Sequence, residues 1–186
     1  MSVQDTDEDV VKKVQQGDVE SFGILVSRFE ARLLRYGRRF LSSRDDIVDL
    51  VQDIFIRVYT NINSFNLSFK FSSWIYRIAH NVFVNALRQQ KNFPVLYFDF
   101  FDELLPLGGE TESPEDESVR NEIRQELVTS LDSLPLKYRE ILILFYFEDM
   151  DYDSIADILH IPISTVGVRL RRGKTYLKKI LTKNNI

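Results

Sequence analysis

The chain has no cysteine and only two histidines, His80 and His160, among 186 residues. Without cysteine there is no disulfide and no thiolate ligand for a metal, and two histidines this far apart do not have the spacing of a zinc site. No apolar run approaches the length that crosses a membrane, and the acidic N-terminus lacks the apolar core of a signal peptide. We therefore expect a cytoplasmic chain that needs no cofactor and does not insert into a membrane.

Glycine and proline are also scarce, with seven and five residues, and five of them fall between positions 93 and 118. The same stretch holds eight acidic side chains between Asp99 and Glu117 and no lysine or arginine. Turn-forming residues with charge of one sign are typical of a linker rather than of a core element. We therefore predict an acidic flexible linker at 93–118, between a domain at 1–92 and a domain at 119–186.

Apolar residues on both sides of this linker recur with helical spacing. In the first domain the pattern predicts helices that open near Asp18, at Asp45 or Asp46, and near Ser72, with a loop over 63–70. In the second domain it predicts a helix over 119–131 and another that starts at Pro135. The expected fold class is all-α, with two small helical bundles joined by the acidic linker.

The end of the chain predicts a helix-turn-helix. Tyr152–Leu159 reads as the first helix with Asp151 as its N-cap, and Pro162 marks the turn because proline does not fit inside a helix. The second helix should run from Ser164, its N-cap, to about Lys183. His160 stands in the turn, where histidine tolerates positive φ better than most residues.

From position 158 to the end there are seven basic residues and no acidic one. A basic second helix in this motif favours binding in the DNA major groove. The alternative is a solvated charged helix that closes a bundle. Because the net charge is −4, the free chain should bind DNA weakly and should need a partner for tight binding.

Three motifs point to a known family. They are Asp49-Leu-Val-Gln-Asp-Ile-Phe55, Trp74-Ile-Tyr-Arg-Ile-Ala-His-Asn81 and Leu134-Pro-Leu-Lys-Tyr-Arg-Glu140. In this order, on either side of an acidic linker, they resemble bacterial sigma factors of the extracytoplasmic-function group. The likeness covers sigma region 2 at 18–91 and sigma region 4 at about 119–183. It implies an initiation subunit that binds core RNA polymerase and promoter DNA, with no catalytic residues, and it makes an anti-sigma factor a candidate partner.

The resemblance assigns polymerase binding to Asp49, Gln52 and Asp53. Their spacing places them on one helix face, while Leu50, Val51 and Phe55 should pack in the core. Without the family likeness, a solvated acidic stripe would be the simpler interpretation of these three side chains.

The resemblance also assigns recognition of the −10 element to the loop over 63–70 and to the helix after it. A side-chain amide can read the Watson–Crick edge of a flipped base, and arginines can hold the melted strand. Trp74 is expected in the core instead. The candidate −10 residues are Asn63, Ser64, Phe65, Asn66, Lys70, Arg77, Asn81 and Arg88.

The basic helix carries the −35 candidates that the resemblance implies. Arginine can bind guanine through two hydrogen bonds or hold a phosphate, and Val168 can touch a thymine methyl group. Gly167 and Val168 replace the longer polar side chains usual in the family, which puts the preferred −35 sequence in doubt. The candidates are Ser164, Thr165, Gly167, Val168, Arg169, Arg171, Arg172 and Lys174.

Three other functions compete with this interpretation. An enzyme is disfavoured because Gly173-Lys-Thr175 lacks the upstream glycine and strand of a phosphate loop, and no nucleophile motif is present. A sigma mimic that only sequesters an anti-sigma protein would not need the basic helix. An ordinary helix-turn-helix regulator would leave the first two motifs unexplained.

Overall fold

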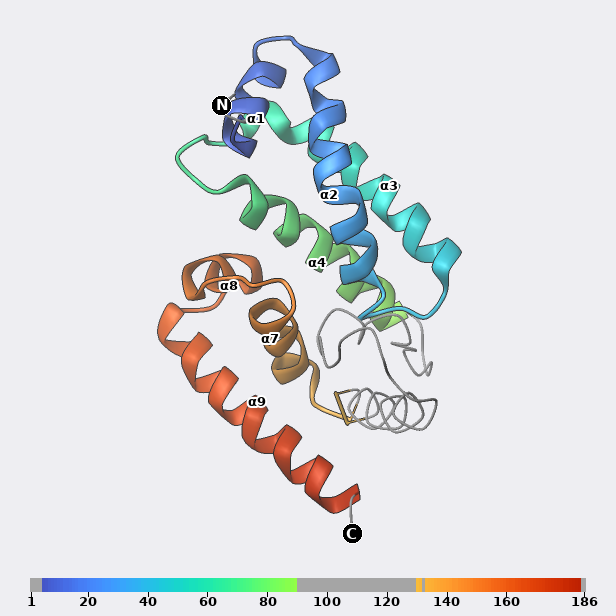
Figure 1. The fold of residues 1–186 in the computed structure, drawn as a ribbon, viewed down its shortest axis with the longest axis vertical. Helices are drawn as coiled ribbons and strands as arrows, with labels where there is room; N and C mark the ends of the chain where they lie inside the picture. The colour runs from blue at the N-terminus through green and yellow to red at the C-terminus, as the bar shows by residue number, and fades with distance from the viewer. Residues whose placement is uncertain (1–4, 90–129, 132, 185–186) are drawn as a thin grey trace, which may run out of the picture. The chain divides into compact units, whose positions relative to one another are not determined.

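The structure is a computed structural model that describes residues 5–89, 130–131 and 133–184, without the side chains of residues 183 and 184. The described elements are all helical, which confirms the predicted fold class (Figure 1). They are α1 (Asp7–Gln15), η1 (Val19–Ser21), α2 (Phe22–Gly37), α3 (Arg44–Asn61), η2 (Ile62–Ser64), α4 (Phe71–Gln89), α7 (Leu136–Tyr146), α8 (Tyr152–Leu159) and α9 (Ile163–Asn184), where η denotes a 3₁₀ helix.

The chain divides into two compact units, the first containing α1 to α4 and the second containing α7 and α9. The predicted linker at 93–118 and nearly all of the helix predicted at 119–131 lie outside the described residues. Each unit is described separately below.

Helix α1 opens with a capping box. The backbone N–H of Asp9 donates to Thr6 Oγ1 over 3.1 Å, and the backbone N–H of Thr6 donates to Asp9 Oδ2 over 3.1 Å. The chain leaves the helix through Gly17, whose φ of +100° is a conformation that glycine adopts without steric cost. Val10 and Val11 are fully buried, so α1 is fixed to the rest of the unit by its apolar face.

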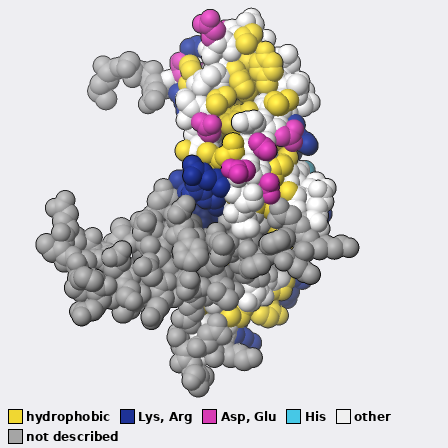
Figure 2. Space-filling model, turned by 90° about the vertical axis from the view of Figure 1, so that its right-hand side faces the viewer, with side chains coloured by type: hydrophobic (Ala, Val, Ile, Leu, Met, Phe, Trp, Pro, Cys, Tyr) yellow, Lys and Arg dark blue, Asp and Glu magenta, His cyan; other side chains and the backbone are white. Residues whose placement is uncertain are grey.

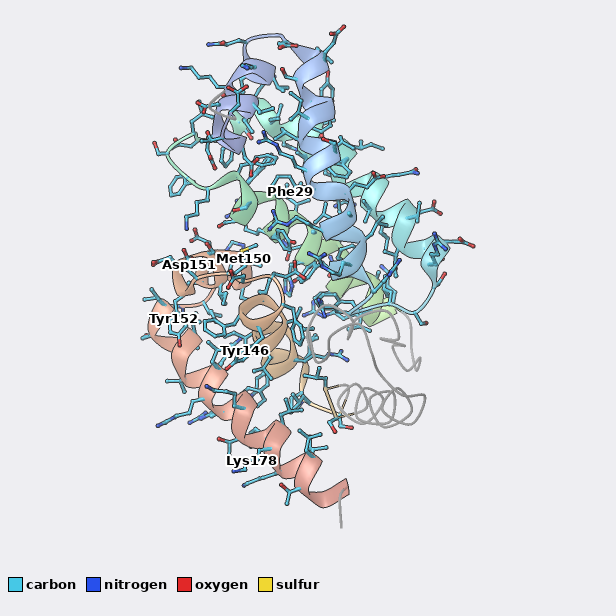
Figure 3. All side chains as sticks on the ribbon, in the orientation of Figure 1. Phe29, Tyr146, Met150, Asp151, Tyr152 and Lys178 are labelled. Carbon is cyan, nitrogen blue, oxygen red and sulfur yellow. The ribbon has the colours of Figure 1, made fainter. Side chains whose placement is uncertain are left out.

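The core of the first unit lies between α2, α3 and α4 and is rich in aromatic rings (Figure 3). Phe29 of α2 meets Phe71 of α4 edge to face, with ring centroids 5.4 Å apart, and Tyr36 meets Phe83 at 6.0 Å. Such pairs contribute about 0.5–1.5 kcal/mol each beyond the burial of their surface. The aromatic contacts therefore join α2 firmly to α4, which carries part of the candidate −10 surface.

Helix α2 ends where it crosses its neighbours most closely. A Cβ atom added to Gly37, its last residue, would lie 2.7 Å from Cζ of Phe83 and 2.8 Å from Cγ2 of Ile47. Glycine is needed here because α3 and α4 leave no room for a side chain.

In the second unit, α9 packs along α7. Val166 and Leu170 of α9 are 0 % and 3 % exposed, as expected for the packing face of the second helix of the motif. Gly173 extends this face, since a Cβ added there would lie 3.3 Å from Cδ1 of Leu142. The other sides of α9 remain available for contacts outside the unit.

The helix-turn-helix forms as predicted. Asp151 Oδ1 accepts a hydrogen bond from the backbone N–H of Ser154 over 2.8 Å, which confirms Asp151 as the N-cap of α8. In the turn, His160 has a φ of +51°, and the N–H of Ile161 donates to the carbonyl of Ala156 over 3.1 Å. This left-handed residue ends α8 and redirects the chain into α9.

Two helix starts differ from the predictions. Helix α9 begins at Ile163, directly after Pro162, and not after Ser164, because the carbonyl oxygen of Pro162 already accepts a hydrogen bond from the backbone N–H of Thr165 over 2.8 Å. Helix α3 begins at Arg44 because Ser43, and not Asp45 or Asp46, is its N-cap and accepts from the backbone N–H of Asp46 over 3.2 Å.

Candidate nucleic-acid and protein interfaces

The loop between η2 and α4 borders a hollow on the surface of the first unit. Five of the eight candidate −10 residues line it, together with three further side chains of the loop and of α4. The lining includes Ser64, Phe65, Asn66, Phe69, Lys70, Ser73, Trp74 and Arg77. Aromatic rings, an amide and two cations next to each other provide the groups that bind an unpaired base and its phosphate.

The two loop phenylalanines have different environments. Phe65 is only 7 % exposed, and its ring lies 5.1 Å from that of Trp74 and 5.8 Å from that of Phe71. Phe69, which sequence reasoning did not select, is 60 % exposed. Phe65 therefore supports the floor of the hollow, whereas Phe69 offers a free ring face on which a base can stack.

The remaining −10 candidates lie outside the lining of this hollow. Asn81 and Arg88 are exposed on α4, four and eleven residues after Arg77, so the three side chains share one helix face. Asn63 is exposed at the other end of the loop. His80, next to Asn81, is instead buried in the core.

The three polymerase-binding candidates lie on the outer face of α3. Asp49 and Gln52 are exposed, and Asp53 is half-buried and receives a 2.8 Å hydrogen bond from Nε of Arg57. Val51 and Phe55 are buried on the opposite side, as predicted, whereas Leu50 is only half-buried. The acidic groups therefore face outward from a helix that is anchored by its apolar side.

Two apolar side chains that sequence reasoning missed extend this face. Ile56 is 62 % exposed and Tyr59 is 42 % exposed. Ile56 follows Gln52 by four residues and Asp53 by three, so the helical spacing could have revealed it. Figure 2 shows acidic and apolar side chains next to each other on this side of the first unit. An apolar centre with a polar rim is the usual composition of a protein-binding surface.

The −35 candidates lie along α9, and most of them point away from the unit. The exposed ones are Ser164, Val168, Arg171, Arg172 and Lys174, and the half-buried ones are Thr165, Gly167 and Arg169. Arg169 Nη1 lies 3.7 Å from Oε1 of Glu140, so this cation is partly neutralised by α7. The outward face therefore carries its strongest positive charge at Arg171, Arg172 and Lys174.

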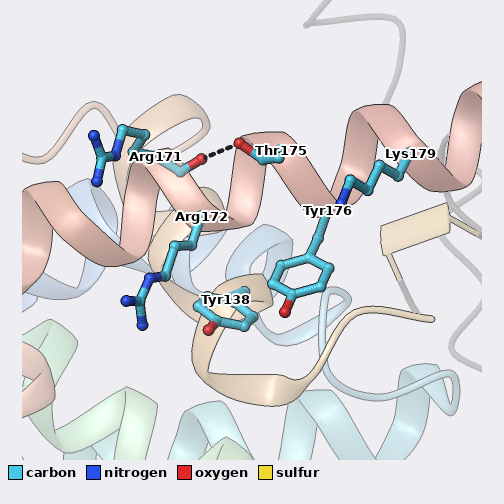
Figure 4. A pocket seen from close by; sticks show the side chains of 6 residues that line it. All are labelled: Tyr138, Arg171, Arg172, Thr175, Tyr176 and Lys179. Carbon is cyan, nitrogen blue, oxygen red and sulfur yellow. Dashed lines mark hydrogen bonds between the residues drawn. The ribbon is translucent and has the colours of Figure 1, made fainter.

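The outward face of α9 continues into a hollow beside α7 (Figure 4). Tyr138 of α7 and Tyr176 of α9 stack there with ring centroids 5.2 Å apart. Figure 4 shows their hydroxyl groups and the guanidinium group of Arg172 extending to the same side of α9. Its described lining is Tyr138, Arg171, Arg172, Thr175, Tyr176 and Lys179, which includes no carboxylate and suits a phosphate.

Gly167 leaves space on α9 that a neighbouring helix fills in part. A Cβ added to Gly167 would lie 3.4 Å from Cε2 of Tyr152, the first residue of α8, which is its nearest neighbour among the described residues. Tyr152 itself is 41 % exposed (Figure 3). The surface at this point of the motif is therefore formed by a tyrosine of the first helix.

The described part of the chain offers neither a metal-binding cluster nor a membrane-spanning helix. No cluster of three histidine, cysteine or carboxylate side chains there could hold a metal ion. None of the helices found there is long and apolar enough to cross a membrane.

The fold and these surfaces define the class of protein, which is a sigma factor of the sigma-70 family. The family models for Sigma-70 region 2 and for Sigma-70, region 4 match residues 25–93 and 124–177. Within this family the chain belongs to the extracytoplasmic-function (ECF) group. It is 32 % identical over 181 residues to the ECF RNA polymerase sigma factor SigW of Bacillus subtilis, which covers 92 % of this chain and 94 % of that protein.

Further comparisons agree with this assignment. The chain is 34 % identical to the ECF RNA polymerase sigma-E factor of Escherichia coli K12, with 94 % of this chain and 93 % of that protein covered. The structure of CnrH in complex with the cytosolic domain of CnrY has the same fold, with a TM-score of 0.71, 22 % identity, and 96 % and 99 % of the two chains covered. The chain is thus an ECF sigma factor that directs RNA polymerase to promoters, and its family consists of initiation factors rather than enzymes.

Proposed function

We propose that the outer face of α3 binds core RNA polymerase, that the hollow beside α4 captures a base of the −10 element, and that α9 binds the −35 element. The domains that do so are region 2 at 1–92 and region 4 at 119–186, joined by the linker at 93–118. No cofactor takes part, and the protein acts in the cytoplasm, where transcription begins. The helix-turn-helix carries this proposal, because its positive-φ turn at His160 presents an outward basic helix.

Polymerase binding is assigned to Asp49, Gln52 and Asp53, with Ile56 at the centre of the surface. The charges support this because exposed carboxylates orient the approaching partner and increase the association rate. A desolvated apolar side chain such as Ile56 contributes most of the affinity. A variant with all three polar residues changed to alanine should fold normally and should lose affinity for core polymerase.

Capture of the −10 base is assigned to the loop hollow. Phe69 offers a ring for stacking, Asn66 offers an amide for the base edge, and Lys70 with Arg77 offers charge for the backbone. Asn81 and Arg88 extend this surface along α4, where the Asn81 amide would help to read the flipped base and Arg88 would hold the melted strand. A flipped base is unstacked at a cost of a few kcal/mol, which such a set of contacts can offset.

Binding of the −35 element is assigned to the outward face of α9. Arg171 and Arg172 can bond guanine edges or phosphates, and Val168 can contact a thymine methyl group. Arg169 contributes less because it faces Glu140. The hollow formed by Tyr138, Tyr176 and Lys179 adds a place for a backbone phosphate.

An anti-sigma factor is proposed as a further partner. The structure from Bartonella quintana that shares this fold, with a TM-score of 0.63 and 20 % identity, is the sigma factor RpoE in complex with the anti-sigma factor NepR. A protein of that kind would cover the exposed apolar side chains of the first unit.

Transcription with purified core polymerase tests the proposed function. The chain is added to bacterial core enzyme on a pool of genomic fragments, and the RNA ends are mapped. We expect initiation at a defined set of promoters that core enzyme alone does not use. Failure to bind core enzyme, or RNA ends identical to those of core enzyme alone, would leave a sigma mimic that only binds an anti-sigma protein.

A further inference from the structure

Helix α1 (Figure 1) lies outside the matched region 2, which begins at residue 25, yet two of its side chains form hydrogen bonds at the two ends of the candidate −10 loop. Gln15 Nε2 donates to the carbonyl oxygens of Ile62 and Phe65 over 2.7 and 2.9 Å. Glu8 Oε1 accepts a hydrogen bond from the backbone N–H of Phe71 over 2.8 Å. Gln15 thus fixes the start of the loop and Glu8 fixes its end.

These two side chains project from a helix that is itself held in place. Asp7 of α1 forms a 2.7 Å ion pair with Arg28 of α2. The hydrogen bonds from Thr6 that close the capping box also lower the pKa of Asp9, so the carboxylate stays charged in its role as acceptor. Because α1 is anchored to α2 and buried along its valines, it can serve as a fixed support for the loop.

Between the two fixed ends, the loop exposes the groups proposed to meet the base. Asn66 Oδ1 accepts from the backbone N–H of Ser68 over 2.9 Å, and the N–H of Phe69 donates to the carbonyl of Asn66 over 3.1 Å. These bonds form a local turn but do not join it to a helix. The position of the turn relative to α4 therefore depends on how the two ends of the loop are held and on the packing of Phe65 against Phe71 and Trp74.

We propose that Gln15 and Glu8 are positioning residues for −10 recognition, and that α1 holds the loop in the shape that accepts the flipped base. A loop that is already ordered loses less entropy on binding, so the fixed ends increase the selectivity of the pocket. This inference rests on the proposed role of the loop in base capture. It gives a promoter-selecting role to a helix that precedes the matched region.

The variant Gln15→Glu tests this directly. Its side chain has nearly the same shape, but the NH2 group with its two N–H donors becomes a carboxylate oxygen that faces two carbonyl oxygens. The matched control is Gln16→Glu, which adds the same charge at the next position, where the side chain is exposed. In a second pair both variants lose the same charge: Glu8→Ala removes the acceptor for Phe71, whereas Glu8→Gln keeps a carbonyl oxygen in its place.

The measurement is open-complex formation by reconstituted holoenzyme on a promoter recovered from the transcription assay. The same promoter is also tested with one −10 base after another substituted, which gives a selectivity ratio at the flipped position. A variant that is merely less stable forms fewer open complexes on both the original and the substituted promoter, so its selectivity ratio stays constant. A misplaced loop lowers the ratio itself.

For the wild type we expect discrimination of about tenfold or more at the flipped base, the size of a typical single-base penalty. Gln15→Glu and Glu8→Ala should bring the ratio close to one with core-polymerase affinity unchanged, and Gln16→Glu and Glu8→Gln should keep it. If Glu8→Ala and a folded Gln15→Glu both keep the wild-type selectivity ratio, this inference is overturned and the proposed function is not. A wild type that opens no promoter would overturn the proposed function and this inference together.

Discussion

His80 is held neutral by its surroundings, although it belongs to a motif that we connect with DNA. It is 7 % exposed, and its Nδ1 lies 3.0 Å from Oη of Tyr36. Burial, with a smaller effect of Arg88, lowers its pKa to about 4. In an unfolded chain the pKa of histidine is about 6.5, so between these values the unfolded state binds more protons and stability rises with pH.

The free energy of unfolding should therefore depend on pH through His80. Its full contribution is present above about pH 6.5 and is lost progressively as pH falls, with about 3 kcal/mol lost by pH 4. Urea unfolding of the wild type and of His80→Gln across this range measures the effect. The variant should have a flatter profile, and two parallel profiles would show that His80 is not the group responsible.

Ile56 is the residue of α3 on which the proposed polymerase surface depends most. Because its side chain is 62 % exposed, Ile56→Ala should leave the free energy of unfolding almost unchanged. A desolvated apolar side chain at the centre of an interface is worth about 2 kcal/mol or more, so affinity for core polymerase should fall more than about tenfold. Titration of core enzyme with labelled protein measures this loss.

Ile24→Ala is the matched control for Ile56→Ala. Ile24 is 40 % exposed but belongs to α2 and not to the acidic face. The two variants remove the same atoms from the surface of one unit. Equal affinities of both variants for core polymerase would move the interface away from α3.

At the scale of elements, the crossing of α2 with α3 and α4 tolerates no added atom. In Gly37→Ala the new Cβ would stand 2.7 Å from Phe83 and 2.8 Å from Ile47, so rings or helices must shift. We expect a loss of about 1–3 kcal/mol in the free energy of unfolding, the usual effect of overpacking. Gly23→Ala, in the same helix with nothing within 4 Å, should instead gain about 0.5–1 kcal/mol.

Denaturant melts of these two variants give the comparison. Both exchange glycine for alanine in α2, so helix propensity changes in the same direction. A Gly37→Ala variant as stable as Gly23→Ala would mean that the helices separate at little cost.

The outward basic face of α9 leads to a prediction of how promoter affinity depends on salt concentration. Holoenzymes with Arg171→Ala or Arg172→Ala are compared with wild type on promoter fragments over a salt series. A lost phosphate contact should weaken all sequences alike and reduce the salt slope by about one, whereas a lost guanine contact should cost about 1–3 kcal/mol on one base only. Unchanged affinity and slope in both variants would place the DNA on another face of α9.

The helices and their apolar faces could largely be predicted from the sequence, because helical periodicity reports the buried side directly. The helix-turn-helix was predicted because its signals are local: the cap at Asp151, the turn at His160 and the proline after it. The support of the −10 loop by Gln15 and Glu8 could not be predicted. It joins residues 47 to 63 positions apart in sequence, and no local pattern records such a bond.

In the candidate site, too, some single residues could be predicted from the sequence and others could not. The core position of Val51 follows from spacing, and it is confirmed. Phe65 and Phe69 stand in one irregular loop without periodicity, so only the folded chain shows that the first is buried and the second exposed. Tyr138 and Tyr176 come from different helices, and their stack depends on the packing of α7 against α9.

For the whole molecule, net charge limits DNA binding by the free protein. The chain carries −4 overall, and five of its acids follow one another closely in the sequence, outside the described residues, at Glu110, Glu112, Glu115, Asp116 and Glu117. Replacing these five with Gln or Asn changes the net charge from −4 to +1. Long-range repulsion between protein and DNA should then fall.

The free variant should therefore bind promoter duplex more tightly than the free wild type, with a difference that shrinks at high salt. The same variant in holoenzyme tests whether the acids also face a basic groove of the polymerase, in which case affinity for core enzyme should fall. Equal behaviour in both assays would make the segment a passive connection.

The space at Gly167 has a consequence for how promoter preference can change over time. Among the described residues, a Cβ added there meets only Tyr152, at 3.4 Å, an ordinary contact, so the fold accepts a side chain at a position that we propose to face the −35 DNA. After gene duplication, one copy can thus acquire a new −35 preference through a single codon while the other keeps the old one. The same freedom makes position 167 a suitable place to engineer pairs of a sigma factor and a promoter, so that in one cell each sigma factor uses only its own promoter.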